Sequence, residues 1–377
     1  MEIYREDKSV VLRYAEHLQG LSPAGLHQVS MREGARILRL SPYRQVGIDV
    51  LDLSTLSTTG TFKDWVACVA VARTRAAGRH VIAAQSSGNT ANALAAYAAR
   101  AGLRAVILYP PQSRRRIHAV PARHPGIDLV EVDACEKHIK DILQDAARAA
   151  DVPALPTLHD QYEGNKLRAY FLRDAVGRSG QGWDWHAQAL SSAYGPLGFY
   201  RGLAETCSAS PARAKVPRFL GVQQESVAPY ARALSGAGPP EEDVVMLEPT
   251  LFRRSVPADL IDRVRQMCVA SNGTVRCLPN ARYLQWEPRA VAMMGEAGAE
   301  ITLSVDGRPQ ERAGLYSLAG VLEAIEDGTI SPGERALAVF TGGSGPVAAT
   351  FLPDHRVTAA DARSYVTQLL AAPTTRP

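Results

Sequence analysis

The chain lacks long hydrophobic runs. Although 46% of its 377 residues are hydrophobic, it contains no stretch of about 18 consecutive apolar residues, the length that a membrane-spanning helix needs. Its first residues, MEIYREDKSVVLRY, also lack the apolar core of a secretory signal. We therefore expect a cytoplasmic protein with no membrane partner.

The chain also has little net charge and few cysteines. Its formal charge is +4 at pH 7, and only Ser113–Arg116 forms a tight basic run. This balance argues against an extended basic surface, so we expect no nucleic-acid partner. The five cysteines show no CxxC spacing, and the histidines show neither an HExxH motif nor paired spacing. We expect reduced, mostly buried thiols and no catalytic metal.

Lysine is rare as well, and this makes one lysine stand out. Lys63 lies in the stretch Thr59-Gly60-Thr61-Phe62-Lys63-Asp64, where a Gly-Thr turn meets the predicted start of a helix. A lysine on a short turn that contains glycine can present its amine to an aldehyde, while Asp64 and the helix N-terminus hold the local backbone. The alternative is an exposed lysine at an ordinary helix start.

A second turn of small residues follows. Ser86-Ser87-Gly88-Asn89-Thr90 lies between a strand pattern, HVIAA, and an apolar helix pattern, ANALAAYAARAGL. The free backbone N–H groups of such a turn form an anion site, although serine and asparagine are also ordinary helix caps. An amine for an aldehyde together with an anion site indicates pyridoxal 5'-phosphate and an amino-acid substrate.

Strand and helix patterns alternate along the rest of the chain. Short apolar strands such as HVIAAQ, RAVILYP and RFLGVQQ, separated by helix patterns, predict an α/β fold with parallel sheets covered on both faces. Residues 75–155 form a compact βαβαβα set and are expected to be a small α/β domain. Residues 1–74 plus 156–370 would form a large cofactor-binding domain, and 371–377 a flexible tail. A cleft between two lobes is the expected ligand site.

The motifs resemble those of a known family. TGTFKD and SSGNTANALAAYAARAGL resemble the two hallmarks of fold type II pyridoxal-phosphate enzymes, which have the tryptophan synthase β-like architecture of two parallel-sheet lobes around the cofactor. The threonine synthase branch, which includes cysteate synthases, is the most similar. The likeness extends from Arg13 to Ala349. Other segments agree in order with the family's RYAEHL, EGxK, phosphate-loop strand and GVQAEG: Leu12–Leu18, Tyr162–Lys166, Asp184–Ala187 and Gly221–Ser226.

The resemblance implies roles for the residues of the first two motifs. Lys63 would bond to the cofactor aldehyde and, once displaced by substrate, remove the Cα proton. Asn89 would hydrogen-bond the 3-oxygen of the cofactor. The groups that would bind the substrate carboxylate are Thr61, Ser86, Ser87, Gly88 and Thr90.

Two later segments would complete the cofactor site. The cofactor phosphate would lie on a helix N-terminus at Ser191, Ser192, Ala193, Tyr194 and Gly195. The family usually has several glycines there, whereas this chain keeps Gly195 and then Gly198, and the alternative is an ordinary β–α turn. Thr341 would place a neutral hydroxyl beside the pyridine nitrogen. A hydroxyl makes the ring a weaker electron sink than a carboxylate would, which suits elimination and replacement chemistry; the alternative is a strand-end threonine.

The expected function is a synthase or lyase that removes a β or γ leaving group from a small, O-phosphorylated amino acid and adds a nucleophile. The basic groups considered for the substrate phosphate are Lys166, Arg168 and Arg201. Departures from the threonine synthase pattern keep a cysteate synthase-like reaction of O-phosphoserine with sulfite as an alternative, and Leu247–Pro257 resembles that group. A non-catalytic amino-acid or cofactor-binding protein is the alternative of another class. A homodimer is expected.

Overall fold

The computed structural model describes residues 1–86, 88–116, 124–209, 215–236, 244–304, 307–342 and 353–372. The chain divides into two compact units. Unit 1 comprises Met1–Asp7, Gly34–Leu56 and Asn165–Gly343, and unit 2 comprises Lys8–Glu33, Ser57–Gly164 and Ser344–Pro377. Residues 8–33, 57–74, 156–164 and 344–370, which we expected in the large domain, therefore group with unit 2. Most of the expected flexible tail lies outside the described residues.

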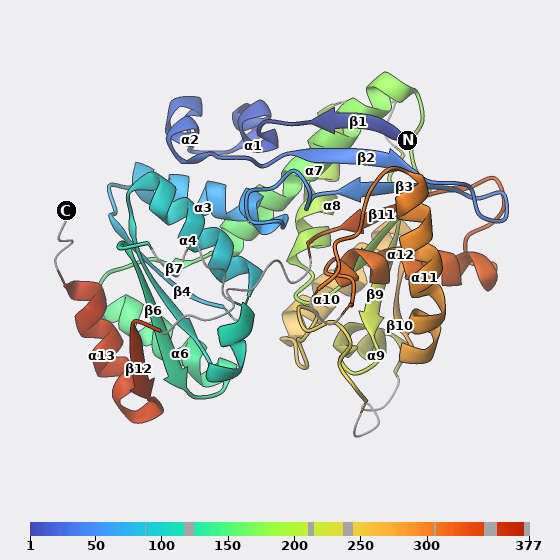
Figure 1. Ribbon diagram of the computed structural model, residues 1–377. Coiled ribbons are helices and arrows are strands. Elements are labelled where there is room, and N and C mark those ends of the chain that lie inside the picture. Colours follow the sequence, from blue (N-terminus) through green and yellow to red (C-terminus); the bar gives the residue numbers. More distant parts are fainter. Residues whose placement is uncertain are drawn as a thin grey trace. The chain divides into compact units, whose positions relative to one another are not determined.

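Unit 1 is built on a mixed sheet. Among the described residues its strands follow the order β1 (Glu2–Glu6), β2 (Ala35–Arg39), β3 (Gly47–Asp52), β11 (Arg335–Phe340), β8 (Trp185–Ala189), β9 (Arg218–Gln224) and β10 (Thr274–Leu278) (Figure 1). From β3 to β10 each neighbouring pair is parallel. The β1–β2 and β2–β3 pairs are antiparallel. The parallel strand predicted at RFLGVQQ, residues 218–224, is therefore confirmed as β9, and an antiparallel edge is added.

Helices cover both faces of this sheet. Apolar residues of α11 (Asn280–Glu296) and α12 (Arg312–Glu326) pack against one face, and those of α9 (Pro229–Ser235) and α10 (Ala258–Ser271) against the other. Helix α8 (Tyr194–Ala209) joins the second group through Tyr194, Leu197 and Tyr200. Because both faces are buried, β8, β9 and β11 are nearly continuous buried runs.

Unit 2 contains a parallel sheet. Within the described residues the order is β12 (His355–Thr358), β6 (Ile127–Asp133), β5 (Arg104–Tyr109), β4 (Val81–Gln85) and β7 (Ala154–Leu155), and every pair is parallel. Helices α6 (Glu136–Ala149) and α13 (Ala359–Ala371) cover one face (Figure 1). Helix α4 (Asn89–Ala101) contacts β4 and β5, and α3 (Lys63–Ala76) packs on α4. Strand β12 and α13 come late in the chain and were not predicted.

The remaining elements are short or connect the sheets. They are α1 (Val10–Arg13), the 3₁₀ helices η1 (Ala15–His17) and η2 (Pro111–Arg116), α2 (Pro23–Val29) and the long α7 (Leu158–Ser179). In the described parts of the chain, no helix combines the length and apolar character needed to cross a membrane.

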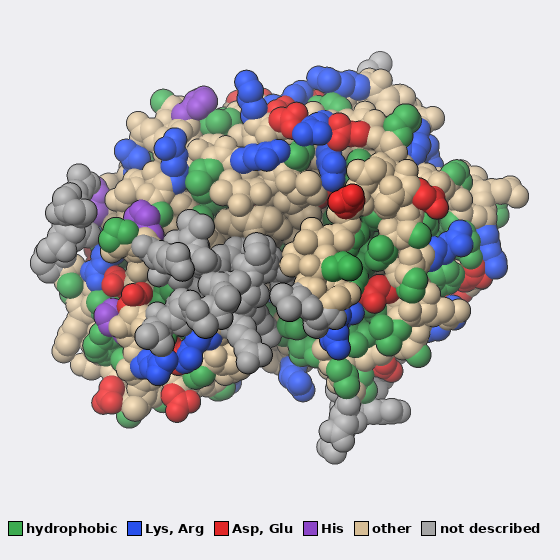
Figure 2. All heavy atoms as spheres, viewed as in Figure 1, with side chains coloured by type: hydrophobic (Ala, Val, Ile, Leu, Met, Phe, Trp, Pro, Cys, Tyr) green, Lys and Arg blue, Asp and Glu red, His purple; other side chains and the backbone are tan. Residues whose placement is uncertain are grey.

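The surface and the cysteines complete the description. On the face seen in Figure 2, side chains of lysine and arginine and those of aspartate and glutamate both occur over much of the coloured surface, in keeping with the small net charge. The expectation of mostly buried thiols holds for Cys68 and Cys268, whereas Cys135 and Cys277 are exposed.

Candidate active site

The turn that carries Lys63 is fixed by its own side chains. Lys63 is the first residue of α3, and Gly60 has a φ of 72°, a conformation that glycine adopts without strain. The Thr59 N–H donates to Asp64 Oδ2 at 2.8 Å, and the Thr59 hydroxyl donates to Asp64 Oδ1. The Lys63 N–H approaches Thr61 Oγ1 at 3.4 Å. Asp64 thus ties the turn to the first turn of α3.

The amine of Lys63 lies over the neighbouring phenyl ring. Its Nζ is 4.5 Å from the centroid of Phe62, within the range of a cation–π contact. The Lys63 side chain is partly exposed, whereas Thr61 and Asp64 are buried. The Lys63 side chain is therefore partly accessible, while two side chains of the turn next to it are buried.

A buried acidic pair lies under this turn, and the sequence did not predict it. Asp64 and Glu33 are each 0% exposed. Glu33 accepts hydrogen bonds from four groups, namely the Ser9 hydroxyl, the Ser30 hydroxyl at 2.7 Å, the Met31 N–H at 2.7 Å and the Tyr97 hydroxyl at 2.6 Å. Burial raises the pKa of Asp64 to about 7, partly offset by hydrogen bonds from Thr59, and the charge of Glu33 adds to the rise.

The second predicted motif forms the start of α4. The Ser86 N–H donates to the Leu108 carbonyl at 3.2 Å, and the Gly88 N–H approaches Ser86 Oγ at 3.3 Å. Gly88 is the N-cap of α4, and Asn89 is the first helical residue. The first turn of α4 has no acid, so the positive end of its dipole is not offset locally. Gly88, Asn89 and Thr90 are partly exposed, and Ser87 lies outside the described residues.

The predicted phosphate turn lies at the carboxyl end of β8. Ser191, Ser192 and Ala193 connect β8 to α8, which begins at Tyr194 and has no acid in its first turn. Ala193 has a φ of 59°, a conformation that normally favours glycine. The Ser192 carbonyl accepts a hydrogen bond from the Tyr230 hydroxyl at 3.1 Å.

Gly195 is the one glycine of this turn, and its position has no room for a side chain. A Cβ there would lie 2.6 Å from Gln188 Nε2 and 3.0 Å from Arg168 Nη2. The backbone of the first turn of α8 therefore rests directly on these two buried side chains.

Two buried hydrogen-bond donors near the carboxyl ends of β8 and β9 indicate that an anionic group would fit there. Gln223 Nε2 and Ser226 Oγ are buried and have no hydrogen-bond partner among the described residues. Gln223 lies at the carboxyl end of β9, the parallel neighbour of β8, so it shares a sheet edge with the Ser191–Gly195 turn. Buried donors without partners are costly, and together with the N–H groups of a helix N-terminus they suit a phosphate.

Thr341 follows β11 at this edge of the sheet. It is 6% exposed, and β11 is the other parallel neighbour of β8. The next N–H, that of Gly342, donates to Glu311 Oε1 at 2.9 Å, and Glu311 also caps α12 by accepting from the Gly314 N–H at 3.2 Å. Burial raises the pKa of Glu311 to about 8. Glu311 is a neighbour of the predicted site that sequence reasoning did not identify.

Lys166 and Arg201, both considered for the substrate phosphate, share one carboxylate. Lys166 Nζ is 3.2 Å from Glu205 Oε2, and Arg201 Nε is 3.5 Å from Glu205 Oε1. The Lys166 side chain is 2% exposed and that of Arg201 is 45% exposed. Lys166 is therefore deeply buried in unit 1, while Arg201 remains accessible to solvent.

The predicted residues fall into two groups. Unit 2 contains those of the first two motifs, namely Thr61, Lys63, Ser86, Gly88, Asn89 and Thr90. Unit 1 contains those expected at phosphate groups and at the ring nitrogen, namely Lys166, Ser191, Ser192, Ala193, Tyr194, Gly195, Arg201 and Thr341.

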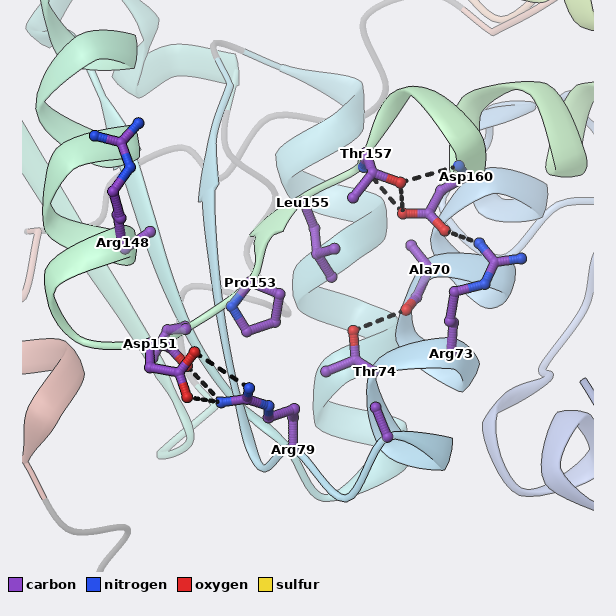
Figure 3. A pocket seen from close by; sticks show the side chains of 13 residues that line it. Ala70, Arg73, Thr74, Arg79, Arg148, Asp151, Pro153, Leu155, Thr157 and Asp160 are labelled. Atoms are coloured by element: carbon purple, nitrogen blue, oxygen red, sulfur yellow. Dashed lines mark hydrogen bonds and ion pairs between the residues drawn. The ribbon is translucent and has the colours of Figure 1, made fainter. Parts of the chain in front are cut away.

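A separate cavity of about 380 Å³ lies in unit 2 and is lined by parts of α3, α6 and the segment before α7. Figure 3 shows four of its charged groups in two pairs, Arg79 with Asp151 and Arg73 with Asp160. None of its lining residues is a predicted site residue. This cavity therefore does not coincide with the predicted chemistry.

Comparisons with known proteins match most of the chain. The family model for "Pyridoxal-phosphate dependent enzyme" matches residues 36–342. Threonine synthase of Mycobacterium tuberculosis is 28% identical over 308 residues, which cover 79% of this chain and 78% of the relative. Cysteate synthase of Methanospirillum hungatei is 22% identical over 310 residues, covering 78% of this chain and 68% of the relative.

A solved structure agrees with the fold. Diaminopropionate ammonia lyase from Escherichia coli superimposes with a TM-score of 0.64 at 14% identity, covering 96% of this chain and 90% of that chain. The shared architecture is that of fold type II pyridoxal-phosphate enzymes, as the sequence motifs predicted.

Proposed function

Because this chain belongs to the pyridoxal-phosphate-dependent enzyme family, we propose that it is a threonine synthase-like synthase or lyase for a small, O-phosphorylated amino acid. The reaction would eliminate a β or γ leaving group and then add a nucleophile. Its cofactor is pyridoxal 5'-phosphate.

The observation that carries the proposal is the position of Lys63. Its amine is presented at the first residue of α3, on a turn that the two Thr59–Asp64 hydrogen bonds hold in place. A held amine is suited to remove and return a proton at the substrate Cα. When bound there, pyridoxal phosphate supplies the electron sink that makes this proton removable.

The start of α4 would bind the substrate carboxylate. The Ser86 and Thr90 hydroxyls and the Gly88 N–H lie at or just before a helix N-terminus with no acid in its first turn, which favours an anion. We propose that Thr61 and Ser87 add hydroxyl donors, and that the Asn89 amide donates to the 3-oxygen of the cofactor.

The edge of the unit 1 sheet would hold the rest of the cofactor. The N–H groups of the Ser191–Gly195 turn would bind the cofactor phosphate. Gln223, on the neighbouring strand β9, and Ser226, just after that strand, would add donors. The Thr341 hydroxyl would face the ring nitrogen and leave it without a carboxylate partner, which favours elimination and replacement. We propose Arg201 and Lys166 as groups for the substrate phosphate, since a guanidinium binds such an anion with two prongs.

A second candidate is β-replacement of O-phosphoserine by sulfite. The match to cysteate synthase of Methanospirillum hungatei over 310 residues favours it. The two candidates differ in the length of the substrate side chain and in the nucleophile, so they are separable by assay. We further propose a homodimer, which light scattering of the purified protein would test.

The first experiment asks whether Lys63 holds the cofactor. Purified protein mixed with pyridoxal phosphate should be yellow, borohydride should bleach the colour, and peptide mapping should find the reduced cofactor on Lys63. A label on a different lysine would reject the assignment of Lys63, whereas a colourless protein would favour a non-catalytic binding protein.

The second experiment identifies the substrate class. O-phosphoserine, O-phosphohomoserine and their O-acetyl counterparts would be offered with water, sulfide or sulfite, and released phosphate or acetate would be measured. Phosphate release is the expected result. Release of acetate alone would reject a phosphorylated substrate.

A further inference from the structure

A buried arginine lies behind the Ser191–Gly195 turn. Arg168 is in α7 and is 1% exposed. Its Nη1 donates to Gln188 Oε1 at 2.9 Å, and its Nη2 donates to Asn165 Oδ1 at 3.0 Å. These two acceptors are neutral amide oxygens, and the hydrogen bonds to them orient the guanidinium. Burial lowers the pKa of Arg168 to about 9, and the group therefore stays cationic at neutral pH.

The contact between Arg168 and the turn is close. A Cβ on Gly195 would lie 3.0 Å from Arg168 Nη2, so the guanidinium rests against the backbone of the first turn of α8. His186 adds no second positive charge here. Burial and the charge of Arg168 lower the pKa of His186 well below its usual value, so its ring is neutral at neutral pH. The guanidinium of Arg168 therefore places a positive charge directly behind this helix N-terminus.

We propose that Arg168 is a positioning residue that supports the Ser191–Gly195 turn and gives it a fixed positive charge for the cofactor phosphate. The inference rests on the proposed function of the turn. A turn with one glycine has less freedom to wrap its N–H groups around an anion than a glycine-rich one. A buried cation is screened less than a surface one, and it adds to the partial charge of the helix N-terminus.

This assignment differs from a role in substrate binding. Arg168 was one of the basic residues considered for the substrate phosphate, but its guanidinium is held by Gln188 and Asn165 beneath the turn. Its effect should therefore depend on the phosphate of the cofactor and should be measurable with no substrate present.

The test compares pyridoxal phosphate with pyridoxal, which lacks the phosphate. Dissociation constants of the apoprotein for both would be measured by absorbance for the wild type, Arg168→Lys and Arg168→Met. Arg173→Met, an exposed change on the same helix, is the matched control. Arg168→Met should weaken binding of pyridoxal phosphate by about ten-fold or more, as loss of a nearby buried charge implies, and leave pyridoxal binding within about twofold. The affinity of Arg168→Lys for pyridoxal phosphate should lie between those of the wild type and Arg168→Met, because lysine keeps the charge but lacks the two-pronged donor set of arginine.

A second variant keeps the arginine in place. Gln188→Glu puts a carboxylate on the acceptor that Arg168 already contacts, and it should reduce the preference for the phosphorylated form as Arg168→Met does. This variant carries the test if Arg168→Met does not fold. Inorganic phosphate should also raise the melting temperature of the wild-type apoprotein more than that of either variant.

The outcomes separate the two proposals. Equal weakening for pyridoxal phosphate and pyridoxal, or no change in either, would overturn the role of Arg168 while the proposed function stands. A wild-type protein that binds neither would overturn the proposed function. The inorganic phosphate measurement then still decides whether Arg168 supports an anion site.

Discussion

Replacing Asp64 by asparagine should remove a pH dependence that is built into the turn carrying Lys63. Asp64 is 0% exposed and accepts both hydrogen bonds of Thr59. The titratable groups near it are Glu33 on the preceding segment, Tyr97 on α4 and Cys68 on α3. Burial raises the pKa of Asp64 to about 7, so the folded protein retains a proton that the unfolded chain releases near pH 4.

The sign of the effect follows from proton linkage. Between the unfolded pKa, about 4, and the folded pKa, about 7, the folded state binds more protons than the unfolded state. Its stability therefore falls as the pH rises through this window. One pKa unit corresponds to about 1.4 kcal/mol, so the contribution of Asp64 should fall by an amount on the order of 4 kcal/mol and then level off above the folded pKa.

Asparagine keeps an acceptor for Thr59 but has no charge to desolvate. Asp64→Asn should therefore match the wild type near pH 4.5 and be the more stable protein near pH 8. The measurement is the denaturation midpoint, followed by circular dichroism at half-unit steps of pH, with apoprotein throughout. The quantity of interest is the difference between variant and wild type, because other titrating groups cancel in it.

Asp52→Asn is the matched control with the opposite sign. Burial alone would raise the pKa of Asp52, but hydrogen bonds from Thr55 and Ser54 and the charge of Arg36 lower it overall. Its stabilising contribution is therefore complete above pH 4 and is lost only in more acidic solution. Asp52→Asn should cost stability by a constant amount between pH 5 and 8. A flat difference for Asp64→Asn over the same range would refute the reasoning about Asp64.

Three further predictions concern the site. Lys63→Ala should fold but lose the borohydride-sensitive colour and all turnover; a retained colour would place the cofactor on another lysine. Asn89→Ala should still bind the cofactor but with a shifted absorbance and slower turnover, because one hydrogen bond of about 0.5–1.5 kcal/mol is lost; an unchanged spectrum would leave Asn89 a helix residue only. Lys166→Ala and Arg201→Ala should reduce turnover of phosphorylated substrates more than of acetylated ones, and equal losses would reject phosphate recognition. Lys166→Ala should also lower stability by about 1–3 kcal/mol, because Glu205 loses a buried partner.

The sequence predicted those parts of the fold in which local pattern and tertiary environment agree. Strands β4, β5 and β6 and helices α4 and α6 were predicted within a few residues, because apolar runs and helical periodicity match their buried faces. The antiparallel strands β1 and β2 and the late strand β12 were not predicted. Strand β12 is half exposed, and its pairing depends on β6, more than two hundred residues earlier in the chain.

The Lys63 turn shows the same limit on a smaller scale. Its motif predicted the position of the amine, and Asp64 was expected to hold the local backbone. Thr59 and Asp64 are five residues apart, so their pairing can be predicted from the sequence as a local cap. The support beneath it is not local, since Glu33 meets Tyr97 only after α4 packs on α3. Hydrogen bonds between residues 64 positions apart leave no periodic signal in a single sequence.

Helix α7 explains why the support of the Ser191–Gly195 turn could not be predicted. Residues 160–169 are all buried, although this stretch includes Glu163, Asn165, Lys166 and Arg168, residue types that are mostly exposed in folded proteins. A composition of this kind predicts a solvated helix face. The fold instead buries Lys166 and Arg168 where each meets a partner from another element, Lys166 with Glu205 and Arg168 with Gln188. Burying a charge without such partners is costly, so the burial of residues 160–169 depends on contacts that form only in the folded chain, and Arg168 makes one of them against the start of α8.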